Sequence, residues 1–355
     1  MSRPFISALI DTCDHEEFIG DAIDSVLEQD FPASELEILV VDDGSSDTTG
    51  EIVRKFQPRV RYMRKTNGGQ GSAFNVGIAE ARGEIIAFLD GDDWWAPGKL
   101  DAIATAFDSE PATGLVGHGI TSVYPDRSRL VQVPRETLRF RVNSVERAKT
   151  FRMCRGFLGT SRMSYRRHIL NQIGFVPEAL RFEADEYLFT LAGFFADVLI
   201  LKESLTFYRL HDKNLYQLSD GDQASARRKY EVIAALSRVL RDRLTELGVP
   251  EAIARTTLEC VSVEAQQLRL ILDSGFPWET VATEMKIMQV FHSDASPWQR
   301  AFSCARLIPA LVMPASSYYR WRQRFTTSAF YRRLRRKFLP FPTPRHVNTT
   351  KEEAN

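Results

Sequence analysis

Residues 85–93 read Ile-Ile-Ala-Phe-Leu-Asp-Gly-Asp-Asp, so five apolar residues run directly into an acidic turn. An apolar run of this length, closed by Asp and Gly, is typical of a strand buried on both faces of a sheet. A second stretch has the same form, because Leu36–Val41 is followed by Asp42-Asp43-Gly44-Ser45. Two such strands favour a parallel sheet with a polar edge at the carboxyl ends of its strands, where ligands bind in this class of fold.

Strand and helix signals alternate outward from these stretches over the first 120 residues. Apolar runs predict further strands at Phe5–Ile10 and Val60–Met63. A spacing of three or four predicts helices over 18–27, 52–56, 73–81 and 97–107, the last with Pro97 in its first turn and an inward face of Leu100, Ile103, Ala104 and Phe107. The alternation predicts an α/β fold, Rossmann-like, with a mostly parallel sheet flanked by helices.

Three regions are expected along the 355 residues. Residues 1–215 contain the alternating pattern and, after residue 120, a more mixed and loop-rich continuation. Residues 216–294 keep a helical period, which predicts a C-terminal helical region. Residues 295–355 form a tail that prolines break into short pieces.

Charge is distributed unevenly, although Lys+Arg and Asp+Glu are both 46. Residues 295–355 contain 12 basic and two acidic residues, a net charge of +10, which leaves −10 on the rest of the chain. A basic tail of this kind favours an anionic partner. The overall composition, 44% hydrophobic and 26% charged, excludes wholesale disorder, collagen and coiled coil.

The four cysteines have no CxxC spacing, which argues against a zinc site and against a disulfide framework. Reduced thiols fit a reducing compartment. The N-terminus lacks the architecture of a signal peptide, and no stretch reaches the roughly 18 apolar residues of a bilayer span. We therefore expect a cytoplasmic protein.

The acidic turn at 90–93 carries the sharpest chemical signal. Asp90 and Asp92 flank Gly91, and two carboxylates at a strand end can bind a hard divalent cation while the glycine lets a ligand approach. The alternative is an acidic turn that only ends the strand. For the other cluster, Asp42–Ser46, the alternative is a cap on the following helix.

Two common phosphate-binding loops are absent from the sequence. The first strand–helix turn, Asp11-Thr12-Cys13-Asp14, lacks the glycines of GxGxxG, and no GxxxxGK(S/T) occurs. These absences argue against a dehydrogenase and against a P-loop NTPase.

Further motifs accompany the two acidic clusters in a definite order: Asn67-Gly68-Gly69, Asn75-Val76-Gly77, Arg82-Gly83-Glu84, Asp185-Glu186-Tyr187-Leu188 and Tyr208-Arg209-Leu210-His211. Together they resemble a family 2 glycosyltransferase of the GT-A fold over residues 4–215. The resemblance implies an inverting enzyme of the hexosyltransferase type, which moves a sugar from a nucleotide-sugar to an acceptor. A nucleotidyltransferase is disfavoured, because no basic glycine loop follows the first strand.

The resemblance also implies roles for residues around the donor. Asp43 corresponds to the aspartate that contacts the nucleobase or ribose, and Asp90 and Asp92 to the DxD pair, with Asp92 as the direct ligand of Mg²⁺ or Mn²⁺. Gly91, between them, belongs to the same donor site. Gln70 and Asn75 would line the donor pocket, although for Asn75 a packing role at the helix start is an equal alternative.

The second motif block implies the groups that act on the acceptor and the diphosphate. Asp185 and Glu186 occupy the position of the family's Glu-Asp pair, in reversed order, and we expect Asp185 to be the general base, with Glu186 as the alternative. An acidic helix start would also explain either residue. His211 resembles a histidine near the diphosphate or metal, and Arg209 would add positive charge there.

The first turn departs from the family pattern, in which a Pro-x-Tyr-Asn-like sequence supplies an aromatic residue for the base. Here Thr12 could hydrogen-bond the base instead. A UDP-sugar is the expected donor, and GDP- and dTDP-sugars remain alternatives. The Gln-x-x-Arg-Trp motif and the membrane spans of processive synthases are both absent from the sequence, which favours a single addition.

The tail interleaves aromatic residues with seven arginines and Lys337 between 318 and 339. Such a segment, within 295–345, is expected to hold the enzyme at the inner face of a membrane. A helix packed on the body is the alternative, and nucleic acid is not expected. The predicted acceptor is a saccharide or lipid-linked saccharide in polysaccharide or surface-glycan synthesis. The second functional hypothesis is a non-catalytic relative that acts as a sugar-nucleotide sensor or membrane scaffold.

Overall fold

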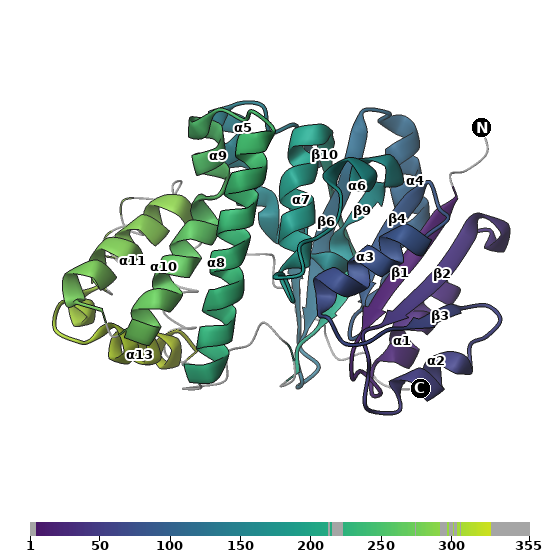
Figure 1. Cartoon of the computed structure of the whole chain (residues 1–355), viewed down its shortest axis with the longest axis horizontal. Coiled ribbons are helices and arrows are strands. Elements are labelled where there is room, and N and C mark those ends of the chain that lie inside the picture. The colour runs from purple at the N-terminus through teal and green to yellow at the C-terminus, as the bar shows by residue number, and fades with distance from the viewer. Residues whose placement is uncertain are drawn as a thin grey trace. The chain divides into compact units, whose positions relative to one another are not determined.

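A computed structural model gives the architecture of the chain (Figure 1). It describes residues 5–211, 214, 223–273, 275–291, 297, 301, 304–305 and 307–327. The chain divides into two compact units, one ending at residue 211 and one within residues 212–343.

The first unit is built on one sheet with the strand order β3-β2-β1-β4-β9-β6-β10-β5, to which β7 adds at β6 and β8 at β10. The strands are β1 (Ile6–Thr12), β2 (Leu36–Asp42), β3 (Arg61–Arg64), β4 (Ile85–Asp90), β5 (Trp94–Trp95), β6 (Thr113–Val123), β7 (Arg129–Gln132), β8 (Leu138–Phe140), β9 (Ser164–Arg166) and β10 (Asp197–Arg209). The first four strands are mutually parallel, as predicted. The predicted α/β class is therefore confirmed, while β9 inserts antiparallel between β4 and β6.

Helices connect and cover these strands: α1 (Ile19–Leu27), η1 (Ala33–Glu35), α2 (Thr49–Arg54), α3 (Gln70–Glu80), α4 (Lys99–Ser109), α5 (Val145–Cys154), η2 (Arg155–Phe157), η3 (Thr160–Arg162), α6 (Arg167–Ile173) and α7 (Ala184–Phe195). One prediction is wrong in its placement, because Pro97 lies before α4 and not in its first turn. Gly98 adopts φ +76°, a left-handed conformation that a helix interior cannot contain, and so α4 begins only at Lys99.

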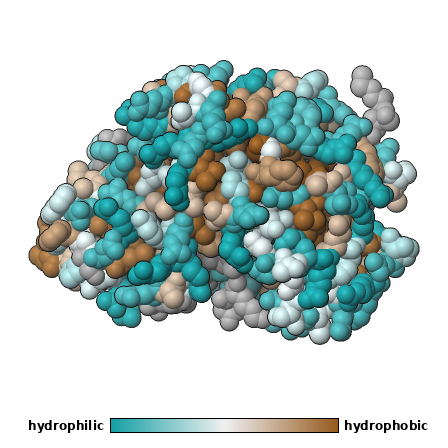
Figure 2. Space-filling model, in the orientation of Figure 1, coloured by the Kyte–Doolittle hydropathy of each residue, from teal (hydrophilic) through white to brown (hydrophobic). Residues whose placement is uncertain are grey.

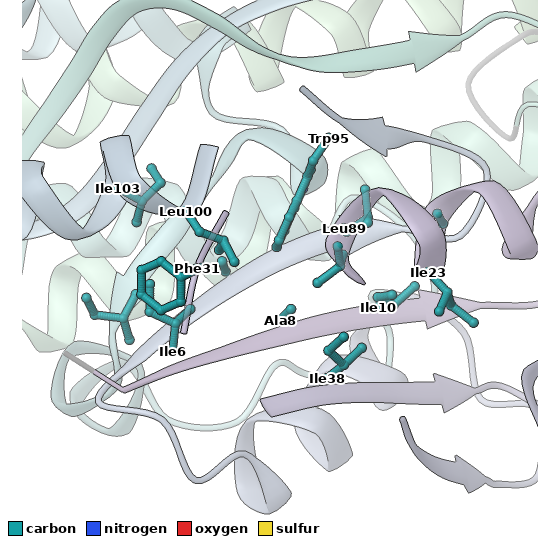
Figure 3. Close-up of a cluster of buried hydrophobic side chains, with 14 of the residues drawn as sticks. Ile6, Ala8, Ile10, Ile23, Phe31, Ile38, Leu89, Trp95, Leu100 and Ile103 are labelled. Atoms are coloured by element: carbon teal, nitrogen blue, oxygen red, sulfur yellow. The ribbon is translucent and has the colours of Figure 1, made fainter. Parts of the chain in front are cut away.

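A single apolar cluster joins the centre of the sheet to α1 and α4 (Figure 3). Alternate residues of β1 contribute Ile6, Ala8 and Ile10, and α4 contributes the inward face predicted from its spacing, all of which is buried. On the opposite face of β1, Leu9 is equally buried. Burial of both faces explains why β4 reads as an unbroken apolar run and β1 as a nearly unbroken one, interrupted by Ser7.

The strand register brings the polar clusters to one edge. In the parallel pairing of β1 with β2, Thr12 lies opposite Asp42, and in the pairing of β1 with β4, Asp11 lies opposite Asp90. The turns that follow β2 and β4 therefore emerge on either side of the end of β1. This arrangement is the polar carboxyl edge predicted from the sequence.

The second unit is helical in its described residues, in agreement with the predicted C-terminal helical region. Its elements are α8 (Gln223–Glu246), α9 (Glu251–Thr257), α10 (Glu259–Asp273), α11 (Pro277–Phe291), η4 (Ile308–Leu311) and α13 (Ala315–Thr327). Leu270 of α10 packs with Ala310 of η4 and Tyr318 of α13 in a core of its own. Within the described part of the chain, none of the helices combines the length and hydrophobicity needed to cross a bilayer.

We predict that Gly83→Ala destabilises the first unit. A Cβ at Gly83 would lie 2.4 Å from the backbone nitrogen of Ser7 and 2.6 Å from the carbonyl oxygen of Ile85, contacts that side-chain rotation cannot relieve. The expected loss is about 3 kcal/mol in the free energy of unfolding, measured by urea denaturation. In the control Gly20→Ala, within α1, the new Cβ meets no atom within 4 Å, so stability should hold or rise. Equal stability of both variants would contradict the close approach of residue 83 to β1.

Candidate active site

Carboxyl groups gather at the carboxyl edge of the sheet. Asp90, Asp92 and Asp93 each offer an oxygen, and these oxygens lie within 4.8 Å of one another. Asp11, opposite Asp90 in register, has a buried Oδ1 without a hydrogen-bond partner. Asp185, in the first turn of α7, lies close enough to raise the pKa of both Asp11 and Asp90. Five carboxyl groups from three separate segments thus share one largely buried space.

The electrostatics of this space favour a bound cation. Burial raises the pKa of Asp11 well above its usual range, and the charge of Asp92 raises it further. Burial likewise raises the pKa of Asp90, with Asp11 as the next cause, and that of Asp93 to about 8. Crowded carboxylates can ionise together only when positive charge is supplied. Carboxylate oxygens are the ligands that Mg²⁺ and Mn²⁺ prefer, and so the donor set fits either cation.

Asp92 differs from its neighbours because histidines face it. Its Oδ2 lies 3.0 Å from Nε2 of His211 and 3.9 Å from Nε2 of His15. Burial alone would raise the pKa of Asp92, but the hydrogen bond from His211 and the charge of His15 outweigh burial and lower it. The ring of His211 packs against Phe18, with 4.6 Å between ring centroids, which fixes its orientation. Asp92 is therefore the carboxylate of the cluster best prepared to stay ionised.

Asp93, in contrast, is held on both oxygens by protein donors. Ser161 Oγ donates to Oδ2 at 2.6 Å, and the backbone nitrogen of Arg209 donates to Oδ1 at 3.0 Å. Ser161 Oγ also accepts from the backbone nitrogen of Asp90 at 3.0 Å. Although Asp93 lies near enough to ligate a cation, its hydrogen bonds suit it better to fixing the acidic turn.

The first strand–helix turn lies directly against Gly91. Thr12 Oγ1 is 3.2 Å from Nδ1 of His15. A Cβ on Gly91 would lie 2.7 Å from Thr12 Oγ1 and 2.8 Å from His15 Nδ1, so the turn leaves no room for a side chain there. The glycine that the sequence placed between the two aspartates is thus required by close packing.

Asp43 organises the glycine-rich turn before α3. Its carboxylate accepts from the backbone nitrogens of Gly68 at 2.9 Å and Gly69 at 2.6 Å, and from Lys65 Nζ at 2.6 Å. Gly69 has φ +85°, and a Cβ there would lie 2.6 Å from Cα of Arg181. The interactions of Asp43 therefore hold the start of α3 at the edge of the site.

Gln70 and Asn75, both on α3, have different environments. Gln70 Nε2 lies 3.4 Å from Asp90 Oδ1 and 3.2 Å from Thr160 Oγ1, and its Oε1 accepts from the backbone nitrogen of Ala184. Asn75 instead pairs with the backbone of Val176, donating to its oxygen at 2.9 Å and accepting from its nitrogen at 2.8 Å. Gln70 is thus brought to the carboxyl cluster, whereas the contacts of Asn75 match the packing alternative.

Asp185 and Glu186, although adjacent in sequence, contact different groups. Asp185 Oδ2 accepts from the backbone nitrogen of Thr160 at 3.2 Å, and burial raises the pKa of Asp185. Glu186 is buried and forms an ion pair with Arg155. Asp185 adds to the electrostatics of Asp11 and Asp90, whose pKa values its charge raises.

The guanidinium of Arg209 is surrounded by protein groups. It lies over the rings of Phe18 and Trp94, 4.9 and 4.6 Å from their centroids. Its Nη2 donates to Asp21 at 2.6 Å, and its Nε donates to the carbonyl oxygen of Asp92 at 3.0 Å. Through its bond to the Asp92 carbonyl oxygen, Arg209 thus stabilises the backbone of the acidic turn.

Sequence reasoning missed Asp11, His15 and Ser161. Asp11 had a signal, because an acidic residue directly after the apolar run of the first strand must emerge beside the other strand ends. His15 and Ser161 had none, since their distances from Asp92 and Asp93 depend on how separate turns fold over the edge.

The profile of the glycosyl transferase family 2 matches residues 7–173. An uncharacterized glycosyltransferase of Nostoc sp. is 30% identical over 251 residues, 68% of this chain and 76% of the relative. The uncharacterized glycosyltransferase EpsJ of Bacillus subtilis is 31% identical over 223 residues, 61% of this chain and 64% of EpsJ. The poly(ribitol-phosphate) β-N-acetylglucosaminyltransferase TarS of Staphylococcus aureus is 37% identical over 106 residues, 29% of this chain and 18% of TarS.

Solved structures share the fold at low sequence identity. The crystal structure of S. aureus TarS 1–349 has a TM-score of 0.55 at 20% identity, covering 90% of this chain and 91% of the other. The mannosyltransferase PcManGT of Pyrobaculum calidifontis, in complex with GDP-Man and Mn²⁺, has a TM-score of 0.50 at 17% identity, covering 94% and 84%. The fold thus agrees with the GT-A expectation. Taken with the relatives above, these matches place the chain in glycosyltransferase family 2, as a transferase.

Proposed function

We propose that the chain transfers one sugar, with inversion, from a nucleotide-sugar to a saccharide or lipid-linked saccharide in polysaccharide or surface-glycan synthesis. The observation that carries the proposal is the cluster of Asp11, Asp90, Asp92 and Asp185 at the carboxyl edge of the sheet, in which Asp11 is buried and the other three are half-buried. A UDP-sugar is the first candidate donor, since a structure of TarS is in complex with UDP-GlcNAc. PcManGT holds GDP-Man, so GDP-sugars, and dTDP-sugars beside them, stay in the tested panel. Because the chain belongs to a family of transferases, the alternative of a non-catalytic sensor or scaffold is disfavoured.

Asp90 and Asp92 would hold the divalent cation, Mg²⁺ or Mn²⁺. His211, expected from the resemblance as a metal ligand, contacts Asp92 Oδ2, which supports a role at the cation site and, at the least, in orienting Asp92. A bound cation would neutralise the charge that develops on the departing diphosphate. Gln70 and Gly91 would border the diphosphate, and Arg209 would add to the local positive charge.

The remaining roles follow from where hydrogen-bonding groups lie. Asp185 would take the proton of the acceptor hydroxyl on its carboxylate, and its raised pKa suits a base that must hold that proton. The glycine-rich turn that Asp43 organises, together with Thr12, would bind the nucleoside. Asn75 would act through the Val176 backbone rather than on the donor.

Membrane association of 295–345 and a location at the inner face of a membrane remain part of the proposal. The basic and aromatic residues from 328 onward lie outside the described residues. The proposal for that segment rests on its net charge of +10 over 295–355 and on its aromatic content.

We predict that Asp92→Asn abolishes metal-dependent donor binding, because an amide neither carries the charge nor ligates as strongly as a carboxylate. Titration calorimetry with UDP-, GDP- and dTDP-sugars, with and without Mn²⁺, should register a loss of more than about 100-fold in affinity, since even groups that only orient metal ligands contribute about 10- to 100-fold. Asp108→Asn, an exposed aspartate of α4, is the matched control. Unchanged binding by the Asp92 variant would remove that residue from the site.

Substitutions at Asp185 and at Glu186 test which of the two carboxylates is the general base. Asp185→Asn should lower the rate of sugar transfer by about 10²- to 10⁴-fold and leave the donor affinity near the wild-type value. Glu186→Gln should weaken the ion pair with Arg155 and lower stability, while the folded protein keeps its rate. If Asp185→Asn keeps the wild-type rate of sugar transfer and Glu186→Gln loses it, the general base is Glu186.

The two amides of α3 give a further test. Gln70→Ala should raise the KM for the donor, because the side chain at Asp90 is removed. Asn75→Ala should instead leave that KM near the wild-type value and lower the free energy of unfolding by about 1–3 kcal/mol, since the Val176 backbone loses its partner. Steady-state kinetics and urea denaturation of both variants measure the difference, and a raised donor KM in Asn75→Ala would return that residue to the donor pocket.

A further inference from the structure

Exposed apolar side chains are concentrated in the second unit. Ten large ones are exposed among the described residues, and six of these lie between 276 and 312: Phe276, Trp278, Met285, Ile308, Leu311 and Val312. Trp278 is 67% exposed and Val312 79%. Single exposed apolar residues are ordinary on a protein surface, but a concentration of them indicates a binding surface.

Helix α11 presents a continuous stripe to solvent. Its exposed residues are Trp278, Ala282, Met285, Lys286 and Gln289. At 3.6 residues per turn these positions fall on one side of the helix, so the stripe is apolar over its first two turns and carries one cation. The opposite side is buried, with Thr280, Thr283, Glu284 and Val290. A surface helix usually presents polar residues to solvent, and α11 instead presents apolar residues over its first two turns.

The short helix η4 continues this apolar character. Leu307 and Ala310 are buried in the core that contains Leu270 and Tyr318. Ile308, Leu311 and Val312 point the other way and are exposed. Because η4 packs on α11, the two sets of exposed apolar residues lie on adjoining elements. We name them the α11–η4 face and define it by the six exposed residues given above. In Figure 2, hydrophobic surface gathers at the left edge of the view, over α11 and the yellow-green segment that Figure 1 draws beside it.

Basic side chains outnumber carboxylates among the exposed residues near the α11–η4 face. Within described residues 275–327, Glu284 is buried in an ion pair with Arg322. Glu279 is half-buried and accepts from the backbone nitrogen of Phe276. No carboxylate of this described stretch is exposed, whereas Lys286, Arg320 and Arg324 are. The sequence over 295–355 adds a net charge of +10.

An anionic lipid surface matches this combination. Aromatic side chains favour the headgroup layer, and exposed basic residues are attracted to lipid phosphates at about 1 kcal/mol each. A second copy of the chain matches less well, since a two-fold contact would place one cationic face against another.

We propose that the α11–η4 face docks the protein on an anionic lipid surface, with Phe276, Trp278 and Leu311 in the headgroup layer and Lys286 and Arg320 against lipid phosphates. The inference deepens the membrane association proposed for 295–345, to which it adds α11 and the residue that precedes it. It requires neither donor nor sugar transfer.

The test measures binding of the full chain to vesicles by co-sedimentation, without donor. Wild-type protein should bind vesicles of phosphatidylcholine mixed with phosphatidylglycerol, bind pure phosphatidylcholine more weakly, and lose binding as salt rises. The double variant Trp278→Glu with Leu311→Glu should lower the partition coefficient by at least about tenfold, because two inserted apolar groups become charged. The control Phe175→Glu, in the first unit, alters a side chain that is 78% exposed and should bind as wild type.

Three results would overturn the proposal. They are no binding by the wild type, binding by the double variant equal to wild type, and a wild-type dimer in solution that the double variant dissociates, which would assign the face to a second copy. Nucleotide release from soluble donors, measured on the same proteins, reports on the sugar-transfer proposal separately. Loss of vesicle binding with unchanged nucleotide release confines the effect to docking.

Discussion

Mutual repulsion among buried carboxylates is the constraint around which the first unit is arranged. The register of β1 against β4 places Asp11 opposite Asp90, and the turn after β4 adds Asp92 and Asp93 within a few residues. Burial removes the water that would otherwise screen these charges. The repulsion raises the pKa values of Asp11 and Asp90, and the cation that we propose for this site would offset the same negative charge.

The groups that hold the cluster come from segments far apart in the chain. Ser161 joins the acidic turn to η3, and its carbonyl oxygen accepts from Lys99 Nζ at 2.7 Å. Lys99 is fully buried, with its ammonium 4.3 Å from the centroid of the Trp95 ring, and burial lowers its pKa well below the usual range. Thr160, also in η3, contacts both Gln70 and Asp185. A short 3₁₀ turn therefore links the acidic turn, the start of α3 and the start of α7.

The two units differ in which kinds of residue they bury and which they expose. The first unit buries charge at a sheet edge, where ligands bind in folds of this class. The second buries Glu284 of α11 in an ion pair with Arg322 and leaves apolar and basic side chains exposed. We propose a nucleotide-sugar with its cation for the first surface and an anionic lipid surface for the second.

The sequence by itself determined the α/β class, the first four parallel strands and the edge at which Asp43, Asp90 and Asp92 emerge, because burial on both faces and strand–helix alternation are local patterns. It also favoured Asp185 over Glu186 as the general base, and it offered a packing alternative for Asn75 but not for Gln70. Only the tertiary structure placed Glu186 against Arg155 and Asn75 against Val176, and brought His15 and Ser161 to the acidic turn. Those distances join segments separated by up to a hundred residues, and they are set by packing, which no local pattern encodes.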